Sequence, residues 1–205
     1  MEAYITVAIV AYVIGSINFA VIFSRKFAGF DVREKGSKNA GTTNVLRTVG
    51  KKVAALTLLC DILKGVVAIL VANLAQVMWN GFDITTLKYI AGFMVILGHT
   101  FPIFFEFRGG KGVATAIGVL LMLNWKIGLI CLTFGILIIA FSKMVSLGSI
   151  SAAILFPVLT IFMQEEFKFV VVLFSTLIAL LVVFNHRSNI KRIKEGKENK
   201  LSLKK

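Results

Sequence analysis

Long uncharged apolar segments restrict the fold of this chain more than any other feature. Five runs contain no Asp, Glu, Lys or Arg, at 3–24, 65–82, 89–105, 144–164 and 169–186. A helix needs roughly 20 apolar residues to cross a bilayer. Because 58% of the 205 residues are hydrophobic and only 16% are charged, the composition is that of a membrane protein. We therefore predict an all-α integral membrane protein.

The pattern predicts about seven transmembrane helices in one polytopic domain over residues 1–205, ending in a short basic tail at 186–205. The first run lacks a basic n-region and a cleavage site, so it is expected to be a retained helix. The segment 112–125 is short for a span, and a thin or partly re-entrant segment fits it equally well. The expected helices are 3–24, 53–76, 87–105, 112–125, 127–142, 147–163 and 168–185.

Basic residues are distributed unequally among the connecting segments. Every second connection belongs to a basic set that carries 19 Lys and Arg residues, whereas the alternate connections carry 3. The basic set consists of residues 24–52, residues 106–111, Lys143 and the tail from 185. Since cytoplasmic loops are enriched in Lys and Arg, we expect the N-terminus outside and the C-terminus in the cytoplasm. The same rule accounts for most of the net charge of +13, so no nucleic-acid binding is expected.

The first basic loop is dense in hydrogen-bond donors. In this loop, Gly36 and Gly41 permit positive φ or a close approach of the backbone to a ligand. Such a loop can form an anion-binding nest, and the alternative is a solvated loop that rests on anionic lipid. The candidate anion-binding residues are Ser37, Asn39, Gly41, Thr42, Thr43, Asn44 and Arg47.

A glycine-rich turn separates the third and fourth expected helices. Pro102 should disturb the end of the third helix. The N–H groups and positive dipole end of the next helix suit a phosphate, and Lys111 adds a compact cation. The turn is not a Walker A loop, because Phe105 and Gly112 replace its first Gly and its Ser or Thr. The alternative is a plain turn with snorkelling cations. The candidates are Gly109, Gly110, Lys111 and Gly112.

A third polar cluster follows the last apolar run. Asn185, Asn189 and Arg192 are spaced i, i+4, i+7, which places them on one helix face. His186 directly follows the apolar run and is a candidate acid or base. The alternative is an ordinary cation-rich tail after a final span.

Two charged residues, Asp61 and Lys64, lie inside the second expected helix at i, i+3. Charge within a membrane costs on the order of 2.5–3.5 kcal/mol per residue on insertion scales, so we expect the two to pair. A structural pair and a substrate-binding role are both compatible with the pattern.

Few residues suit a metal or a redox centre. His99 and His186 are the only histidines, and Cys60 and Cys131 lie in apolar runs without metal-ligand spacing. We expect no metal and no cofactor, free buried thiols, and a hydrogen-bonded structural role for His99. Neither histidine has Asp five residues later, so the His-x4-Asp signature of coenzyme A-dependent glycerolipid acyltransferases is absent.

These three clusters, in this order, resemble the bacterial acyl-phosphate:glycerol-3-phosphate acyltransferase family over essentially the whole chain. Asp61 with Lys64, and Ser146 with Ser149, also resemble family positions, and Lys143 departs from an expected Arg. The matching motifs are Gly36–Asn44 with Arg47; Gly98–Pro102 with Phe105 and Arg108–Thr115; and His186, Arg187, Asn189, Ile190, Arg192, Gly196 and Glu198.

The resemblance implies transfer of a fatty acyl group from acyl phosphate to the sn-1 hydroxyl of glycerol 3-phosphate. The products would be lysophosphatidic acid and phosphate, in phospholipid biosynthesis at the bacterial inner membrane. It implies a site that faces the cytoplasm, the lipid bilayer as surroundings and no cofactor, and we expect a monomer.

The resemblance also suggests residue roles. Ser37, Asn39, Thr42, Thr43 and the Gly109–Gly112 turn would lie near acyl phosphate, with Gly41 and Asn44 in the same loop. Arg47, Lys111, Ser149, Asn189 and Arg192 would bind glycerol 3-phosphate. His186 would contact that substrate or act as base, unless the donor's own phosphate accepts the proton. The residues expected to be catalytic are Ser37, Arg47, Lys111, His186 and Asn189.

Two other functions fit the composition. A small organic-anion transporter would carry charged residues at mid-depth on several helices, whereas only Asp61 and Lys64 lie deep here. A non-catalytic scaffold for anionic lipid would tolerate Lys111→Arg.

Overall fold

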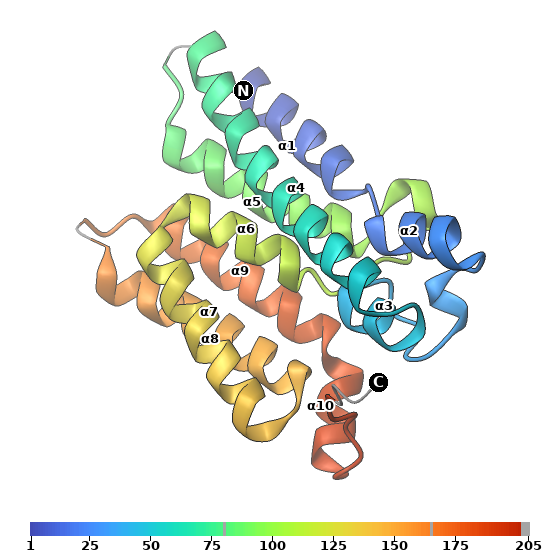
Figure 1. Cartoon of the computed structure of the whole chain (residues 1–205). Coiled ribbons are helices and arrows are strands. Elements are labelled where there is room, and N and C mark those ends of the chain that lie inside the picture. The colour runs from blue at the N-terminus through green and yellow to red at the C-terminus, as the bar shows by residue number, and fades with distance from the viewer. Residues whose placement is uncertain (80, 165, 202–205) are drawn as a thin grey trace. The chain divides into compact units, whose positions relative to one another are not determined.

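The described residues, 1–79, 81–164 and 166–201 of a computed structural model, contain helices and no strand (Figure 1). The tail predicted at 186–205 therefore lies partly outside the described residues. The chain divides into two compact units, residues 1–123 and 124–205. The expectation of a single domain stays a prediction.

The first unit contains the three long helices α1, α4 and α5 and several shorter ones. Helix α1 packs mainly against α5, and α4 packs against α6 and α5. The elements are α1 (Glu2–Gly15), α2 (Phe19–Ala28), η1 (Val32–Glu34), α3 (Thr42–Thr48), α4 (Lys51–Met78), α5 (Ile84–Thr100), η2 (Ile103–Phe105) and α6 (Val113–Leu123).

Small residues allow the helices of this unit to approach closely. A Cβ on Gly15 would overlap the carbonyl of Val95, and one on Gly98 would overlap the carbonyl of Tyr12, so α1 and α5 touch backbone to backbone. Gly65 likewise lies against the backbone of α6. Such small-residue contacts are typical of helix packing in membranes, where apolar burial between helices adds little.

The first apolar run is not one continuous helix, so the prediction of a helix over 3–24 is wrong in that respect. Helix α1 ends at Gly15, and Asn18 starts α2 because its Oδ1 accepts a hydrogen bond from the N–H of Val21 at 3.1 Å. Lys64 Nζ donates to the carbonyls of Gly15 and Ile17, at 3.1 and 2.9 Å. The break persists in an apolar setting because Lys64 pairs two carbonyl groups at the break, which are costly to leave unpaired there.

The second unit is a set of antiparallel helices followed by a short helix. Its elements are α7 (Trp125–Ser142), α8 (Val145–Met163), α9 (Phe169–Asn185) and α10 (Arg187–Lys194). Gly135 of α7 and Gly148 of α8 lie at their contact, where an added Cβ on Gly148 would overlap the Gly135 carbonyl. The axis bends by 58° between α9 and α10, at His186.

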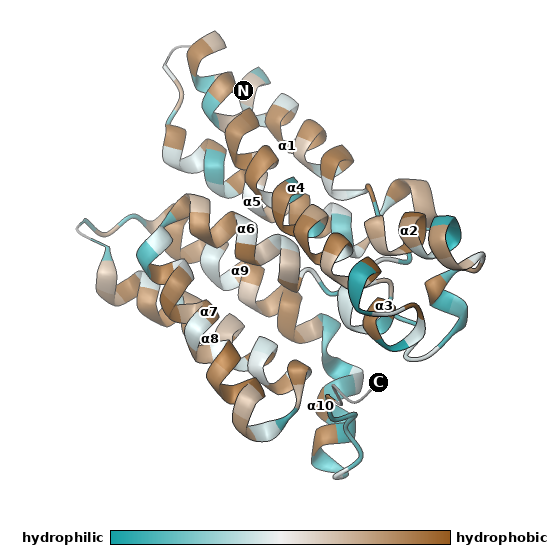
Figure 2. Cartoon of the chain, viewed as in Figure 1, coloured by the Kyte–Doolittle hydropathy of each residue, from teal (hydrophilic) through white to brown (hydrophobic). Residues whose placement is uncertain are grey.

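Five helical segments in the described chain are long and apolar enough to cross a membrane, or six if α9 and α10 form one bent span. Each of the seven expected segments contains a helix, but the third ends at Thr100 and not at 105, as the short helix η2 follows after a break. Because α6 has only 11 residues and α9 by itself has 17, the count of seven is not reached on length. Figure 2 shows hydrophobic residues along these helices and hydrophilic ones on α10 and the first loop. Exposed side chains such as Leu74, Phe141 and Phe162 suit a lipid environment. The orientation stays a prediction.

The deep charges form a pair, as predicted. Lys64 Nζ lies 2.9 Å from Asp61 Oδ1, and both side chains are almost fully buried. His99 Nδ1 lies 3.5 Å from the same carboxylate oxygen. Because Lys64 also pairs the carbonyls at the α1–α2 break, the geometry favours the structural interpretation over substrate binding.

Removal of either charge should leave the other buried without its partner. We expect Asp61→Asn and Lys64→Met each to lower stability by about 3–5 kcal/mol, measured by thermal unfolding in detergent. The double variant should lose less than the sum of the single losses, because neither residual charge remains. The exposed Lys52 on the same helix provides the control Lys52→Met, which should change stability little. Strictly additive losses would contradict the pairing.

Candidate functional site

Asn44 organises the first loop. Its buried amide Nδ2 donates to the carbonyls of Val32, Lys35 and Asn39 at 2.9–3.1 Å, and its Oδ1 accepts from the N–H of Ser37 at 2.9 Å. These four bonds close residues 32–44 around one side chain. All polar atoms of the Asn44 amide therefore bind the loop backbone. This geometry favours a role for Asn44 in shaping the loop, whereas a contact with substrate was predicted.

The other candidates of this loop surround Asn44. Ser37 and Arg47 are exposed, and Asn39, Gly41 and Thr43 are partly exposed. The hydroxyl of Thr42 is buried and has no hydrogen-bond partner within the described residues. Because a buried hydroxyl normally has a partner, Thr42 is a position at which a bound ligand can supply one.

The glycine turn is attached to the end of α5. Gly109 N–H donates to the carbonyl of Thr100 and Gly110 N–H donates to the carbonyl of His99, both at 3.1 Å. These two N–H groups therefore pair carbonyl groups at the C-terminal end of α5 and are not available to an anion. The predicted anion-binding nest is thus restricted to Lys111, Gly112 and the first turn of α6. The first N–H groups of a helix have no acceptor within the helix and so can bind an anion.

Gly110 fills a gap too small for any other residue. An added Cβ would overlap Nε2 of His99 on one side and lie 2.7 Å from the carbonyl oxygen of Ala40 on the other. The turn and the first loop thus meet directly at Gly110. His99 is buried between Gly110 and Asp61, which supports its predicted structural role.

The turn also contains backbone strain. Glu106 and Phe107 adopt left-handed conformations, with φ of 59° and 56°. Non-glycine residues in this region cost about 1–3 kcal/mol each and persist only where surrounding contacts hold them. Hydrogen bonds from the N–H groups of Phe105 and Phe107 to the carbonyl of Pro102 contribute to that support.

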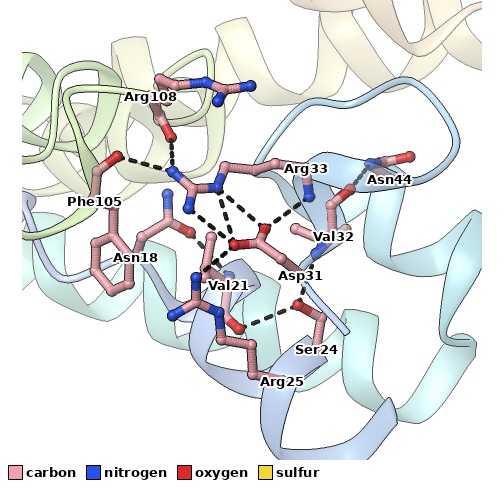
Figure 3. Close-up of polar contacts among 10 residues, drawn as sticks. All are labelled: Asn18, Val21, Ser24, Arg25, Asp31, Val32, Arg33, Asn44, Phe105 and Arg108. Carbon is pink, nitrogen blue, oxygen red and sulfur yellow. Dashed lines mark hydrogen bonds and ion pairs between the residues drawn. The ribbon is translucent and has the colours of Figure 1, made fainter. Parts of the chain in front are cut away.

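A guanidinium from the first loop provides a further contact with the turn (Figure 3). Arg33 Nη1 donates to the carbonyl of Phe105 at 2.8 Å and to that of Arg108 at 3.4 Å. Its Nε and Nη2 bind the carboxylate of Asp31 at 2.9–3.2 Å. The side chain of Arg33 is only 9% exposed, so this bridge lies inside the first unit.

Asp31 holds two arginines. In addition to the bonds from Arg33, the Asp31 carboxylate accepts a hydrogen bond from Arg25 at 2.8 Å. The side chain of Arg25 is 56% exposed. Burial alone would raise the pKa of the Asp31 carboxyl, but hydrogen bonds from Arg33 and Arg25 outweigh it. The pKa of Asp31 is lowered from 3.8 to about 2.

In the second unit, Glu198 gathers the third cluster. Its carboxylate accepts hydrogen bonds from Ser146 at 2.9 Å, Asn189 at 2.7 Å and Arg192 at 2.9 Å. Burial would raise the pKa of Glu198, but these three donors lower it below its usual value. Asn189 and Arg192 thus lie on one face around a common acceptor, as their spacing predicts.

The remaining candidates of this unit are buried. His186 lies at the bend between α9 and α10, where its Nδ1 is 2.7 Å from the carbonyl oxygen of Val182 and donates to it. Ser149 donates within α8, to the carbonyl of Val145 at 2.9 Å. Across the described ranges no three His, Cys, Asp or Glu residues form a potential metal site.

Two residues that organise the first loop and the turn, Asp31 and Arg33, were not singled out from the sequence, whereas Glu198 was named in the third motif but given no role. The pattern Asp31-x-Arg33 stands at the start of the first loop, and Glu198 is one of few acids in a basic tail. A carboxylate isolated among cations is a detectable signal for pairing. The sequence does not show that Arg33 also reaches residues more than 70 positions away.

The fold and these clusters define a polytopic membrane protein with donor-rich segments suited to phosphate groups. The model of the glycerol-3-phosphate acyltransferase family matches residues 5–196. The chain belongs to this family.

Relatives and solved structures agree over nearly the whole length. The chain is 44% identical to the glycerol-3-phosphate acyltransferase of Clostridioides difficile over 99% of the chain and 98% of the relative. It is also 44% identical to the glycerol-3-phosphate acyltransferase of Thermoanaerobacter sp. strain X514, over 100% of the chain and 98% of the relative.

Two crystal structures of the integral membrane glycerol 3-phosphate acyltransferase PlsY superpose well. The glycerol 3-phosphate form has a TM-score of 0.86 at 35% identity and covers 97% of this chain and 96% of the other. The lysophosphatidic acid form has a TM-score of 0.83 at 33% identity, with coverage of 97% and 95%.

The two arginine contacts make Asp31 an acid-sensitive point of the fold. Since its pKa falls from 3.8 to about 2 on folding, the ionised carboxylate stabilises the protein above the unfolded value, and this contribution is lost as pH falls through the folded value. We expect Asp31→Asn to lower the melting temperature at pH 7, with a difference from the unmodified protein that disappears between about pH 4 and pH 2. The exposed Glu34 provides the control Glu34→Gln. A difference independent of pH would contradict the assignment.

Proposed function

We propose that this protein transfers a fatty acyl group from an acyl phosphate to the sn-1 hydroxyl of glycerol 3-phosphate. The products are 1-acyl-glycerol 3-phosphate and inorganic phosphate. The observation that carries the proposal is the match over nearly the whole chain to structures of PlsY in glycerol 3-phosphate and lysophosphatidic acid forms. The absence of the His-x4-Asp signature supports acyl phosphate as the donor in place of acyl coenzyme A.

The chemistry requires orientation more than a nucleophilic side chain. An acyl phosphate is a mixed anhydride with a good leaving group, so a hydroxyl can attack its carbonyl directly. The protein must hold two anionic substrates together in a near-attack arrangement. Cations and N–H donors offset the repulsion and stabilise the oxyanion and the departing phosphate.

In the first unit, the first loop and the glycine turn have the groups that this task needs. We assign Ser37, Asn39, Thr42 and Thr43 to the acyl phosphate, together with the backbone at Gly112 and the start of α6. Arg47 and Lys111 provide cations for glycerol 3-phosphate. Gly109, Gly110 and Asn44 position these groups, because their polar atoms already bind the protein backbone.

In the second unit, Glu198 pre-organises Asn189 and Arg192. We assign both residues to glycerol 3-phosphate, with Ser149 at the start of α8 and His186 at the helix bend. Since the Nδ1 of His186 donates to a backbone carbonyl, its ring orientation is set by the protein. The donor's own phosphate accepts the proton of the attacking hydroxyl.

The reaction places the protein in phospholipid biosynthesis at the bacterial inner membrane. The excess of Lys and Arg in alternate connections supports a site that faces the cytoplasm and an N-terminus outside. Acyl chains would enter from the surrounding bilayer. We expect a monomer that needs no cofactor.

Purified protein should release phosphate from palmitoyl phosphate only when glycerol 3-phosphate is present, with lysophosphatidic acid formed in equal amount. Lys111→Arg should lower kcat/KM by about tenfold to hundredfold, because a planar fork displaces the substrate phosphate from its position. Lys143→Arg, at an exposed helix end, is the matched control and should remain active.

Three results would contradict the proposal. Palmitoyl coenzyme A as the better donor would exclude the assigned leaving group. Transport of labelled anion into liposomes without phosphate release would favour a transporter. Full activity of Lys111→Arg would remove this lysine from the site.

A second test concerns the proton acceptor. If the donor phosphate accepts the proton, His186→Ala should keep the shape of the kcat pH profile, although its KM for glycerol 3-phosphate rises. His186→Asn is the matched variant, since its amide can still donate to the carbonyl of Val182. Loss of turnover together with loss of an inflection from the kcat pH profile would assign the base role to His186.

A further inference from the structure

The contacts of Arg33 suggest a role that neither the loop nor the turn reveals separately. Its guanidinium is the group that joins the carboxylate of Asp31 to the carbonyls of Phe105 and Arg108. Figure 3 shows these two carbonyls, which belong to the residues directly before and after the strained pair Glu106 and Phe107 in the chain. The bridge therefore holds both ends of the strained segment from the side of the first loop.

We propose that Arg33 is a positioning residue that holds the glycine turn in register with the first loop, and thereby sets the placement of Lys111 relative to Arg47. The inference rests on the proposed function, in which these two cations bind glycerol 3-phosphate. In this role Arg33 acts through the turn and not by contact with the substrate. The side chain of Arg33 makes three hydrogen bonds to the Asp31 carboxylate and one to each of the two turn carbonyls.

The local geometry supports a rigid connection. Arg33 N–H also donates to Asp31 Oδ1 at 2.9 Å, so the carboxylate fixes both the backbone and the side chain of Arg33. The N–H of Val32 donates to Ser24 Oγ at 3.1 Å, and this bond attaches η1, the short helix that contains Arg33, to α2. Val32 and Ala40 belong to a buried cluster against which Phe105 packs. The backbone of Arg33, from which the bridge to the turn extends, is therefore held in place on several sides.

The chemistry of the fork explains why arginine is present. Arginine offers five N–H donors in one plane and can bind a carboxylate with one edge while another nitrogen reaches a carbonyl. Lysine carries the same charge on a single nitrogen and cannot hold both partners in this geometry. A substitution that keeps the charge should therefore fail to preserve the register.

Arg25 provides a matched control. Both arginines bind the same carboxylate, Arg25 at 2.8 Å and Arg33 at 2.9 Å. Within the described residues, Arg25 makes no hydrogen bond to the turn, and its side chain is largely exposed. Arg25→Gln thus removes one cation from Asp31 and leaves the bridge to the turn in place.

The experiment measures binding of glycerol 3-phosphate by titration calorimetry to the purified full chain in detergent. The dissociation constant is independent of the folded fraction, which the stoichiometry reports separately. We expect Arg33→Gln and Arg33→Lys each to raise the dissociation constant about fivefold or more. Arg25→Gln should stay within about twofold of the unmodified protein.

Several results would overturn the inference. An unchanged dissociation constant in either Arg33 variant would do so, since Arg33→Lys tests the fork itself. An equal rise in Arg25→Gln would assign the effect to the charge around Asp31. Failure of both Arg33 variants to fold, while Arg25→Gln folds, would make Arg33 a general requirement of the fold.

The same samples separate this inference from the proposed function. If the unmodified protein binds glycerol 3-phosphate but transfers no acyl group from palmitoyl phosphate, the proposed donor fails and the test of Arg33 still stands. If the unmodified protein does not bind glycerol 3-phosphate, the inference fails, because there is no site for Arg33 to position.

Discussion

Pairing of buried charge with backbone carbonyl groups is the interaction on which this structure depends. Lys64 binds the two carbonyls at the break between α1 and α2, and Arg33 binds the two carbonyls that bracket the strained turn. In each case a carboxylate next to the cation, Asp61 or Asp31, offsets the cost of its burial. An apolar environment has no water to solvate such groups, so irregular backbone is stable only where side chains pair it.

The same principle separates residues that hold the site from residues available to a substrate. The amide of Asn44 and the N–H groups of Gly109 and Gly110 are used by the protein backbone. Glu198 has a comparable function in the second unit, where it collects three donors. The proposed reaction, in which the protein binds two mutually repelling anions, would benefit from such supports, because fixed donors need no reorganisation when charge develops.

Much of the fold followed from apolar periodicity and charge alone. All seven expected segments contain a helix, Asp61 and Lys64 pair, and the family is the one that the motifs resemble. The break at 16–18 was not predicted, because Ser16 and Asn18 are uncharged and do not interrupt the apolar run. The short α6 was recognised only as a doubtful span, since length alone does not distinguish a thin span from a partly re-entrant one.

The sequence by itself determined that the chain is a helical membrane protein of the glycerol-3-phosphate acyltransferase family, since hydropathy, charge and local motifs are properties of neighbouring residues. The tertiary structure decided which polar groups support the site. Arg33 meets the carbonyl of Phe105 across 72 positions, and Ser146 meets Glu198 across 52. A backbone carbonyl carries no sequence signature, so only the folded chain shows which side chain reaches it.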